Sequence, residues 1–241
     1  MQSAETSPDE TRLQVVGVWL LPLCEGALWW PQQRVLVVSD LHLEKGSSFA
    51  SRGQLIPPYD TDATLTVVET LITTLKPDIT LSLGDSFHDR SAEVRLSAAS
   101  TSRIQSLTDS TDWIWVEGNH DPDPPKHLGG RAQKTVHLGP LVFRHEPTGE
   151  VGEIAGHLHP AAKVRGRGRS VRRRCFVTDG DRLIMPALGA FTGGLNICDQ
   201  AVTGLFPDGY MAFVLGEGRV YAMGERQLIP DGKPPGTLWR L

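Results

Sequence analysis

Short runs of apolar, largely β-branched residues recur in the first half of the chain and predict buried strands of a central sheet. Two amphipathic segments, residues 60–75 and 92–107, lie between these runs and place their apolar side chains on one helical face. Asp60 or Thr61 is expected to cap the first helix, and Pro77 to end it. Strand and helix therefore alternate, which predicts parallel strands. The strands are expected at residues 34–39, 79–83 and 113–116.

The pattern changes after residue 134, where no long helical period remains and short strands are predicted instead. These strands are expected at residues 136–143, 154–155, 176–178, 183–185, 210–215 and 219–223. The Asp179-Gly180 pair favours a tight hairpin, and residues 216–218 a second one. Residues 13–30 are apolar but interrupted by glycine, proline and glutamate, whereas a membrane span needs about 20 nearly unbroken apolar residues. Two buried strands joined by a turn are expected there, with no insertion into a membrane.

Composition adds little beyond a soluble globular protein: 39% of the 241 residues are hydrophobic, 22% are charged, and the formal net charge is −4. One core can serve a chain of this length, so residues 13–241 are expected to form a single domain. Residues 1–12 are polar and acidic, lack a secretory signal and are expected to be a disordered tail. The three cysteines are far apart without Cys-x-x-Cys spacing, which argues against disulfides and a zinc ribbon and favours a cytoplasmic location.

Side chains that can bind metal follow the apolar runs at several points along the chain. Together they make seven candidate ligands: Asp40, His42, Asp85, Asn119, His145, His157 and His159. Imidazole mixed with carboxylate suits divalent ions such as Mn²⁺, Fe²⁺ and Zn²⁺. Seven ligands are too many for one ion, so two ions that share the carboxylate of Asp85 are expected. In an extended segment alternate side chains point the same way, so each of the pairs Asp40/His42 and His157/His159 is expected to reach one ion.

His120 is not needed as a ligand. It lies among the candidate ligands and next to Asp121, where an imidazole can protonate a leaving oxygen or stabilise charge on a phosphoryl group. The other histidines, His88, His127 and His137, are interpreted as ordinary loop or surface residues, although His88 follows Asp85 closely.

The order Asp-x-His, Gly-Asp, Gly-Asn-His-Asp, His and Gly-His-x-His, which runs from Asp40 to His159, resembles the signature of the calcineurin-like metallophosphoesterase superfamily. The resemblance implies an α/β fold, a four-layer α/β/β/α sandwich with two mixed sheets, and a centre of two ions, often Mn²⁺. It implies that Asp40, His42, Asp85 and His159 hold one ion, and that Asp85, Asn119, His145 and His157 hold the other. It further implies that His120 is the catalytic histidine and that Asp121 orients it.

A closer resemblance extends over residues 15–200, through the segments 40–46, 57–61, 165–169, 174–177 and 186–195. These segments are similar to the bacterial ligase-associated DNA damage response endonucleases (PdeM). That family implies metal-dependent cleavage of DNA phosphodiester bonds in DNA repair. It also implies partnership with a DNA ligase, a helicase and an exonuclease-like protein.

Residues 163–174 carry seven basic residues and no acidic one, in a chain that is acidic as a whole. Most charge runs are solvated surface. Because this run begins four residues after His159, it is also interpreted as a track for a DNA backbone beside the ions. The candidate substrate-binding residues are Arg165, Arg167, Arg169, Arg172, Arg173 and Arg174.

Three functions remain open at this point. The first is hydrolysis of DNA by a dinuclear metal centre, and the second is the same chemistry on a small cyclic or linear nucleotide. The third is a non-catalytic scaffold that docks repair proteins. A scaffold has no reason to gather so many costly polar groups in one place, which favours the two enzymatic functions.

Overall fold

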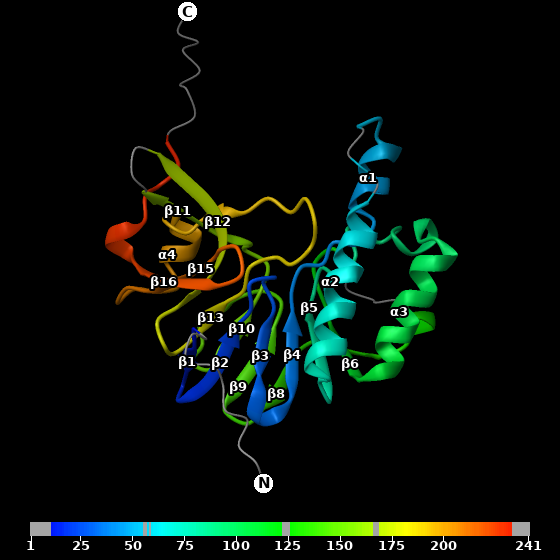
Figure 1. Ribbon diagram of the computed structural model, residues 1–241, viewed down its shortest axis with the longest axis horizontal. Coiled ribbons are helices and arrows are strands. Elements are labelled where there is room, and N and C mark those ends of the chain that lie inside the picture. Colours follow the sequence, from blue (N-terminus) through cyan, green and yellow to red (C-terminus); the bar gives the residue numbers. More distant parts are fainter. Residues whose placement is uncertain (1–10, 55–56, 58, 122–125, 166–168, 233–241) are drawn as a thin grey trace, which may run out of the picture.

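The computed structural model, which describes residues 11–54, 57, 59–121, 126–165 and 169–232, consists of two mixed β-sheets with helices outside them (Figure 1). The first sheet has seven strands in the order β1-β2-β3-β4-β5-β6-β7. The second has nine, in the order β14-β11-β12-β13-β10-β9-β8, with β15 paired to β12 and β16 paired to β15. The predicted α/β sandwich with two mixed sheets is confirmed.

The first sheet contains the predicted alternation of strand and helix. Its strands are β1 (Leu13–Val15), β2 (Val18–Pro22), β3 (Leu28–Trp30), β4 (Val35–Val38), β5 (Ile79–Leu83), β6 (Asp112–Val116) and β7 (Arg131–Gln133). The strands from β1 to β4 pair antiparallel, and those from β4 to β7 pair parallel. The helices are α1 (Lys45–Ser51), α2 (Asp60–Leu75) and α3 (Ala98–Ser110). Helix α2 connects β4 to β5 and α3 connects β5 to β6, so these carboxyl strand ends share one edge.

The second sheet is built largely of hairpins and carries a single short helix, α4 (Gln200–Thr203), among the described residues. Its first strands are β8 (Val136–Leu138), β9 (Leu141–Arg144), β10 (Glu153–Ala155), β11 (Pro160–Arg165) and β12 (Ser170–Thr178). The others are β13 (Leu183–Ile184), β14 (Leu195–Asn196), β15 (Met211–Leu215) and β16 (Val220–Gly224). The predicted pairings of β12 with β13 and of β15 with β16 are confirmed as antiparallel.

The layers follow from the alternation of side chains along the strands. Val35 and Val37 of β4 pack into the cluster between the two sheets, whereas Leu36 and Val38 pack with the residues of α2 and α3. A third cluster, which includes Val202 of α4, covers the outer face of the second sheet. Strand β4 is therefore apolar on both faces, as expected for a central strand in a layered sandwich.

Three details of the first half differ from the sequence prediction. Residues 13–30 form three strands rather than two. Helix α3 begins at Ala98 because the hydroxyl of Ser97 accepts a hydrogen bond from the backbone of Ser100 and caps it there. Neither Asp60 nor Thr61 caps α2. These two side chains instead bind the backbone N–H groups of Gly46 and Glu44, and so fasten α2 to the segment that carries α1.

The ends of the chain are only partly described. Residues 1–10 of the predicted tail, which was expected to span residues 1–12, lie outside the described residues. Thr11 belongs to the fold, because its hydroxyl donates a hydrogen bond to the carbonyl of Val220. None of the helices in the described ranges has the length and apolar character needed to span a bilayer.

Candidate metal centre and active site

The candidate site residues come from both sheets and lie where strands end. Asp40 and His42 follow β4, Asp85 follows β5, and Asn119 follows β6. From the second sheet, His145 follows β9, and His157 and His159 occupy the connection between β10 and β11. Residues far apart in the sequence therefore meet at one edge of the sandwich.

The backbone of these connections is strained. Five of the candidate ligands have left-handed φ angles: Asp40 (52°), His42 (44°), Asp85 (46°), His157 (68°) and His159 (46°). Such values are uncommon outside glycine and cost about 1–3 kcal/mol each, and they persist where the surrounding structure fixes them. The prediction that Asp40/His42 and His157/His159 lie on extended segments is therefore wrong. Each strained residue turns the chain sharply, which sends His157 and His159 into different groups.

The first group consists of Asp40, His42 and His159, whose ligand atoms lie within 4.8 Å of one another. The Nε2 atoms of His42 and His159 are 3.2 Å apart, and His159 Nε2 lies 3.2 Å from Asp40 Oδ1. Asp40 is held by its other oxygen, Oδ2, which accepts hydrogen bonds from Ser39 Oγ (2.6 Å) and the backbone N–H of His157 (3.0 Å). Its Oδ1 thus stays directed at the imidazoles.

The second group consists of Asp85, His145 and His157, also within 4.8 Å of one another. His145 Nδ1 lies 2.9 Å from the carbonyl oxygen of Leu83 and must donate to it, since a carbonyl only accepts. This bond leaves Nε2 of His145 facing the group, 3.2 Å from His157 Nδ1. The side-chain oxygen of Asn119 lies 2.9 Å from His145 Nε2 and 3.1 Å from His157 Nδ1. Asn119 therefore adds a fourth possible ligand.

Asp85 lies between the two groups. Its Oδ1 is 3.4 Å from His145 Nε2 of the second group, and its Oδ2 is 4.0 Å from His42 Nε2 of the first. Each carboxylate oxygen thus faces a different group, as a bridging ligand requires.

Two glycines of the sequence motifs, Gly84 and Gly156, lie so close to neighbouring side chains that no Cβ atom would fit. A Cβ atom on Gly84, whose φ is +69°, would collide with the ring of His145. A Cβ atom on Gly156 would collide with Ser39 Oγ and the carboxylate of Asp40. Any side chain at either position would displace a candidate ligand, which accounts for the Gly-Asp and Gly-His pairs in the sequence.

The donor set fits two divalent cations. Asp40 Oδ1 faces the first group and is buried without a hydrogen-bond partner among the described residues, and such an atom in a native protein calls for a partner. Imidazole nitrogens 3.2 Å apart in both groups converge on a point between them, and each group adds a carboxylate. This composition of nitrogen and carboxylate oxygen suits the first-row divalent metals and zinc.

Burial and the neighbouring carboxylates shift the pKa values of the candidate ligands in different directions. Burial lowers the pKa of His145, but its hydrogen bond to Asp85 and the charges of Asp40 and Asp85 outweigh this and raise it to about 9. Burial raises the pKa of Asp85, but His145 lowers it to about 2. Only a neutral imidazole coordinates a metal, so His145 would have to give up any second proton to hold an ion. For His42, burial is the largest effect and lowers the pKa to about 3.

His120 stands at the solvent-facing side of the groups, with 42% of its side chain exposed and its Nε2 3.9 Å from Asp85 Oδ2. Its Nδ1 lies 2.9 Å from the carbonyl oxygen of His88, to which it must donate. This bond leaves Nε2 to face the site. The ring of His88 also stacks on His120, with centroids 5.8 Å apart. His88, interpreted from the sequence as an ordinary loop or surface residue, thus contacts His120 through its backbone carbonyl and its ring.

Asp121 is placed differently from its implied role. The buried carboxylate accepts a hydrogen bond from the backbone N–H of Phe87 (3.1 Å), while the carbonyl of His88 orients the ring of His120. Burial is the main cause that raises the pKa of Asp121 to about 7, and the charge of Asp85 adds to it. Asp121 thus supports the loop that carries Asp85 rather than the imidazole.

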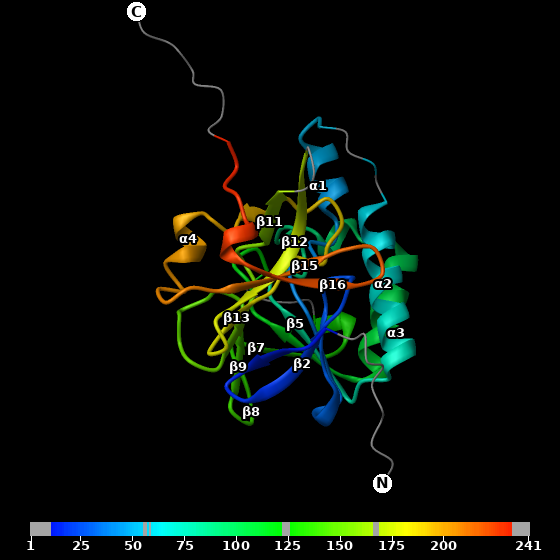
Figure 2. The same cartoon turned by 60° about the vertical axis from the view of Figure 1, so that its left-hand side comes forward.

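The basic run forms the hairpin of β11 and β12, which projects from the same end of the molecule as α1 (Figures 1 and 2). Arg165, Arg169 and Arg173 are exposed, whereas Arg167 lies outside the described residues. Arg172 pairs with Asp231 at 3.4 Å and donates to the carbonyl of Gly194.

Arg174 does not fit the substrate-binding role predicted for it. Its guanidinium is turned inward and donates to the carbonyls of Ala187 (2.6 Å), Leu188 (3.0 Å) and Glu25 (3.3 Å). Burial lowers its pKa. Arg174 therefore fastens the loop after β13 to the first sheet, a structural role that the sequence run concealed.

Comparison with known proteins is consistent with this geometry. The sequence model described as calcineurin-like phosphoesterase matches residues 33–180, a range that contains every candidate ligand. The chain belongs to the calcineurin-like phosphoesterase family. Membership supports a metal-dependent hydrolase, and the family's use of two metal ions agrees with the two Asp/His groups. No curated protein matches.

Among solved structures, the nuclease MPE of Pseudomonas putida is similar, with 29% identity, a TM-score of 0.69, and coverage of 89% of this chain and 100% of that one. Protein AQ665 of Aquifex aeolicus has 18% identity and a TM-score of 0.37 over 52% of this chain and 78% of that one. The E. coli phosphoesterase Yfce has 14% identity and a TM-score of 0.40 over 79% and 98%. The last two scores are too low to support an inference.

Proposed function

We propose that this protein is a phosphodiesterase that uses two divalent ions, Mn²⁺ in the cell, to hydrolyse DNA. The observation that carries the proposal is the basic hairpin, which begins at the residue after His159 and bears the exposed Arg165, Arg169 and Arg173. The similarity to a nuclease over 89% of the chain supports a nucleic-acid substrate. We further propose that the reaction serves DNA repair alongside a DNA ligase, a helicase and an exonuclease-like protein, as the family resemblance implies.

The roles of the residues follow from their positions. In this proposal Asp40, His42 and His159 hold one ion, Asn119, His145 and His157 hold the other, and Asp85 bridges them. Two such ions supply a water activated for attack and positive charge against the phosphoryl oxygens. Ser39 and the carbonyl of Leu83 fix the orientations of Asp40 and His145, as outer-shell partners do in metal sites.

His120 acts as the proton donor. Because Nδ1 donates to the carbonyl of His88, the proton that can be exchanged is carried by Nε2, which faces the site. An imidazolium there can protonate the oxygen that leaves when the phosphodiester bond breaks. The partly exposed ring can then recover its proton from solvent.

Substrate assays on protein freed of metal and refilled with Mn²⁺, Mg²⁺ or Zn²⁺ test the function. The substrates are an aryl phosphodiester, a phosphomonoester, a cyclic dinucleotide, and labelled single- and double-stranded DNA. We expect turnover of DNA and of the aryl diester, with Mn²⁺ the most effective ion. Turnover of the cyclic dinucleotide with no cleavage of DNA would reject the proposed substrate, and inactivity on every substrate would reject the enzyme.

Neutralising the exposed part of the hairpin should weaken DNA binding. If Arg165, Arg169 and Arg173 each contact a phosphate, their change to Ala should flatten the slope of log Kd against log salt concentration by about 2–3 units. Turnover of a small aryl diester should hardly change, because that substrate spans no such surface. The measurement is Kd for a labelled oligonucleotide over a salt series.

The matched control for this triple variant removes Arg34, Lys76 and Arg131, which lie at the other end of the parallel strands. It alters net charge equally but should leave the salt slope unchanged. Equal slopes for the hairpin variant and the wild type would remove the hairpin from DNA binding.

A further inference from the structure

The loop that connects β13 to β14, residues 185–194, is hydrogen-bonded near both of its ends to the backbone of candidate ligands. Near its start, the N–H of Gly189 donates to the carbonyl of Asp40 (3.2 Å), and that of Leu188 to the carbonyl of Ser39 (2.9 Å). At its end, the N–H of Leu195 donates to the carbonyl of His159 (3.0 Å). The loop therefore spans from one candidate ligand of the first group to another, and its backbone is held beside that group.

Phe191 lies within this loop and has two unusual properties. Its φ of +57° is a genuine outlier for an aromatic residue. Its side chain is also 53% exposed, so burial gives little compensation for the strain. Two residues of chain span at most about 7 Å, which keeps Phe191 close to the Gly189–Asp40 contact. A strained residue that gains little from packing points to a function for its exposed ring.

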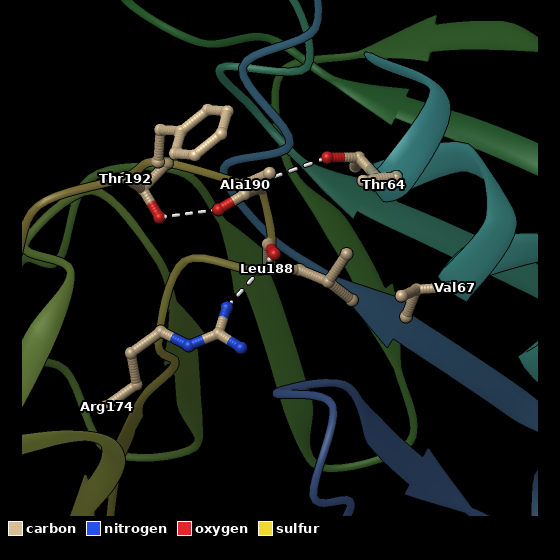
Figure 3. Close-up of a pocket in the computed structure, with 9 residues that line it drawn as sticks. Thr64, Val67, Arg174, Leu188, Ala190 and Thr192 are labelled. Atoms are coloured by element: carbon tan, nitrogen blue, oxygen red, sulfur yellow. Dashed lines mark hydrogen bonds between the residues drawn. The ribbon is translucent and has the colours of Figure 1, made fainter. Parts of the chain in front are cut away.

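The loop and α2 line an open pocket of about 310 Å³, and Phe191 belongs to its wall (Figure 3). Its wall includes Thr64 and Val67 of α2, Leu188 of the loop, and Arg174, whose guanidinium is held by the backbone carbonyls described above. Pockets for small molecules begin at about 300 Å³, so this pocket suits one ring system and not a folded chain or a duplex.

The polar groups of this wall are already paired within the protein. Thr64 Oγ1 accepts a hydrogen bond from the N–H of Ala190 (3.1 Å), and Thr192 Oγ1 donates to the carbonyl of Gly189 (2.7 Å). Arg174 donates to the carbonyl of Leu188, as Figure 3 shows. Because these groups already have partners in the protein, the apolar surface of Val67, Leu188 and Phe191 is what remains for contact with a flat ring.

We propose that this pocket, with the ring of Phe191 at its edge, takes one unpaired nucleobase of the strand whose phosphodiester lies in the metal centre. The base stacks on Phe191, and stacking tolerates any base because every base has a π-face. This inference rests on the proposed function, since it names how that same site holds a nucleic acid. It assigns to Phe191 a substrate-binding role independent of the charged hairpin.

A binding cycle between protein and DNA tests the proposal. The variant is Phe191→Gly, because glycine adopts a φ of +57° without strain, and the loss of the ring is then separated from distortion of the loop. Kd is measured by fluorescence anisotropy for a single-stranded oligonucleotide and for a series in which one abasic nucleotide is moved along it. The protein is metal-loaded, and the oligonucleotides carry phosphorothioate linkages that slow cleavage, so the strand stays intact during the measurement.

With the normal oligonucleotide, Phe191→Gly should raise Kd by about 5- to 150-fold, the usual worth of one stacked base. One abasic position should weaken binding to the wild type by a similar factor and leave binding to the variant unchanged. Phe191→Trp should restore affinity and the abasic effect. The matched control is Trp19→Ala, which removes an aromatic side chain that is 50% exposed on β2. This variant should change neither the Kd for the normal oligonucleotide nor the effect of the abasic position.

The outcomes separate this inference from the proposed function. Equal Kd values for Phe191→Gly and wild type, or equal responses to every abasic position, would overturn the nucleobase site while wild-type cleavage of DNA still supports the function. If the wild type neither binds nor cleaves DNA, the function itself fails. A melting temperature for Phe191→Gly at or above the wild-type value is also expected, and a large decrease would assign Phe191 a structural role instead.

Discussion

Asp85→Asn should reduce both the metal content of the protein and its turnover. The carboxylate faces both groups, with Oδ1 3.4 Å from His145 Nε2 and Oδ2 4.0 Å from His42 Nε2. An amide of the same shape has no charge to set against two dications, and its NH₂ group would face one of the ions. Loss of an outer-shell partner alone costs about 10–100-fold in metal affinity, so loss of the bridge should cost at least that.

The fold should survive this change, because the side-chain oxygen of Asn can still accept the hydrogen bond that Asp85 Oδ1 takes from the N–H of His120 (2.9 Å). The measurement is the number of ions per chain by elemental analysis after reconstitution, with turnover of the aryl diester in parallel. Asp78→Asn is the control, because Asp78 is an exposed carboxylate just before β5, the strand that Asp85 follows. Two ions per chain and full turnover in Asp85→Asn would show that Asp85 is not the bridge.

The sequence was sufficient to predict the arrangement of the strands whose carboxyl ends carry the site residues. The apolar runs at β4, β5 and β6 are separated by helical segments, so the strands pair parallel and their carboxyl ends must coincide. Any polar residue directly after such a run is then brought to one edge. This is why the order of apolar runs and polar residues suffices to assign Asp40, Asp85 and Asn119 to one site.

The local backbone could not be predicted, because left-handed φ angles in Asp and His leave no mark in hydrophobic periodicity. An extended Asp-x-His would have directed both side chains to one face, and the same rule would have joined His157 to His159. The structure instead turns at every one of these residues and divides the two histidines between the groups. Only long-range packing, such as the collision that a Cβ on Gly156 would cause, reveals this constraint.

The sequence of a charge run also does not show which of its side chains are exposed. Arg172, Arg173 and Arg174 are consecutive and look equivalent in sequence, but alternation along β12 sends neighbouring side chains to opposite faces. Arg174 thereby reaches the carbonyls of Ala187 and Leu188, while Arg173 is exposed. The division depends on the register of β12 and on a loop that follows β13, and neither can be derived from the run itself.

His120→Asn should leave both ions in place and lower turnover of DNA by about 10²–10⁴-fold, the usual worth of a positioned general acid. The side chain is partly exposed and is held by a bond to the carbonyl of His88 rather than by a candidate ligand. Its removal therefore takes away a proton donor without opening either group. The metal-to-protein ratio and turnover per bound ion are both measured, with His127→Asn as a control. His127 is exposed and pairs with Glu93, so its loss should leave turnover unchanged.

The size of the effect should depend on the leaving group. The oxygen that leaves from DNA is a poor leaving group unless it is protonated, whereas a nitrophenolate departs as a stable anion. His120→Asn should therefore lose much more activity on DNA than on a nitrophenyl diester. Equal losses on both substrates would mean that His120 stabilises charge on the phosphoryl group and donates no proton to the leaving oxygen. A variant that loses metal but keeps its turnover per remaining ion would make His120 a ligand, contrary to the position of its ring in the structure.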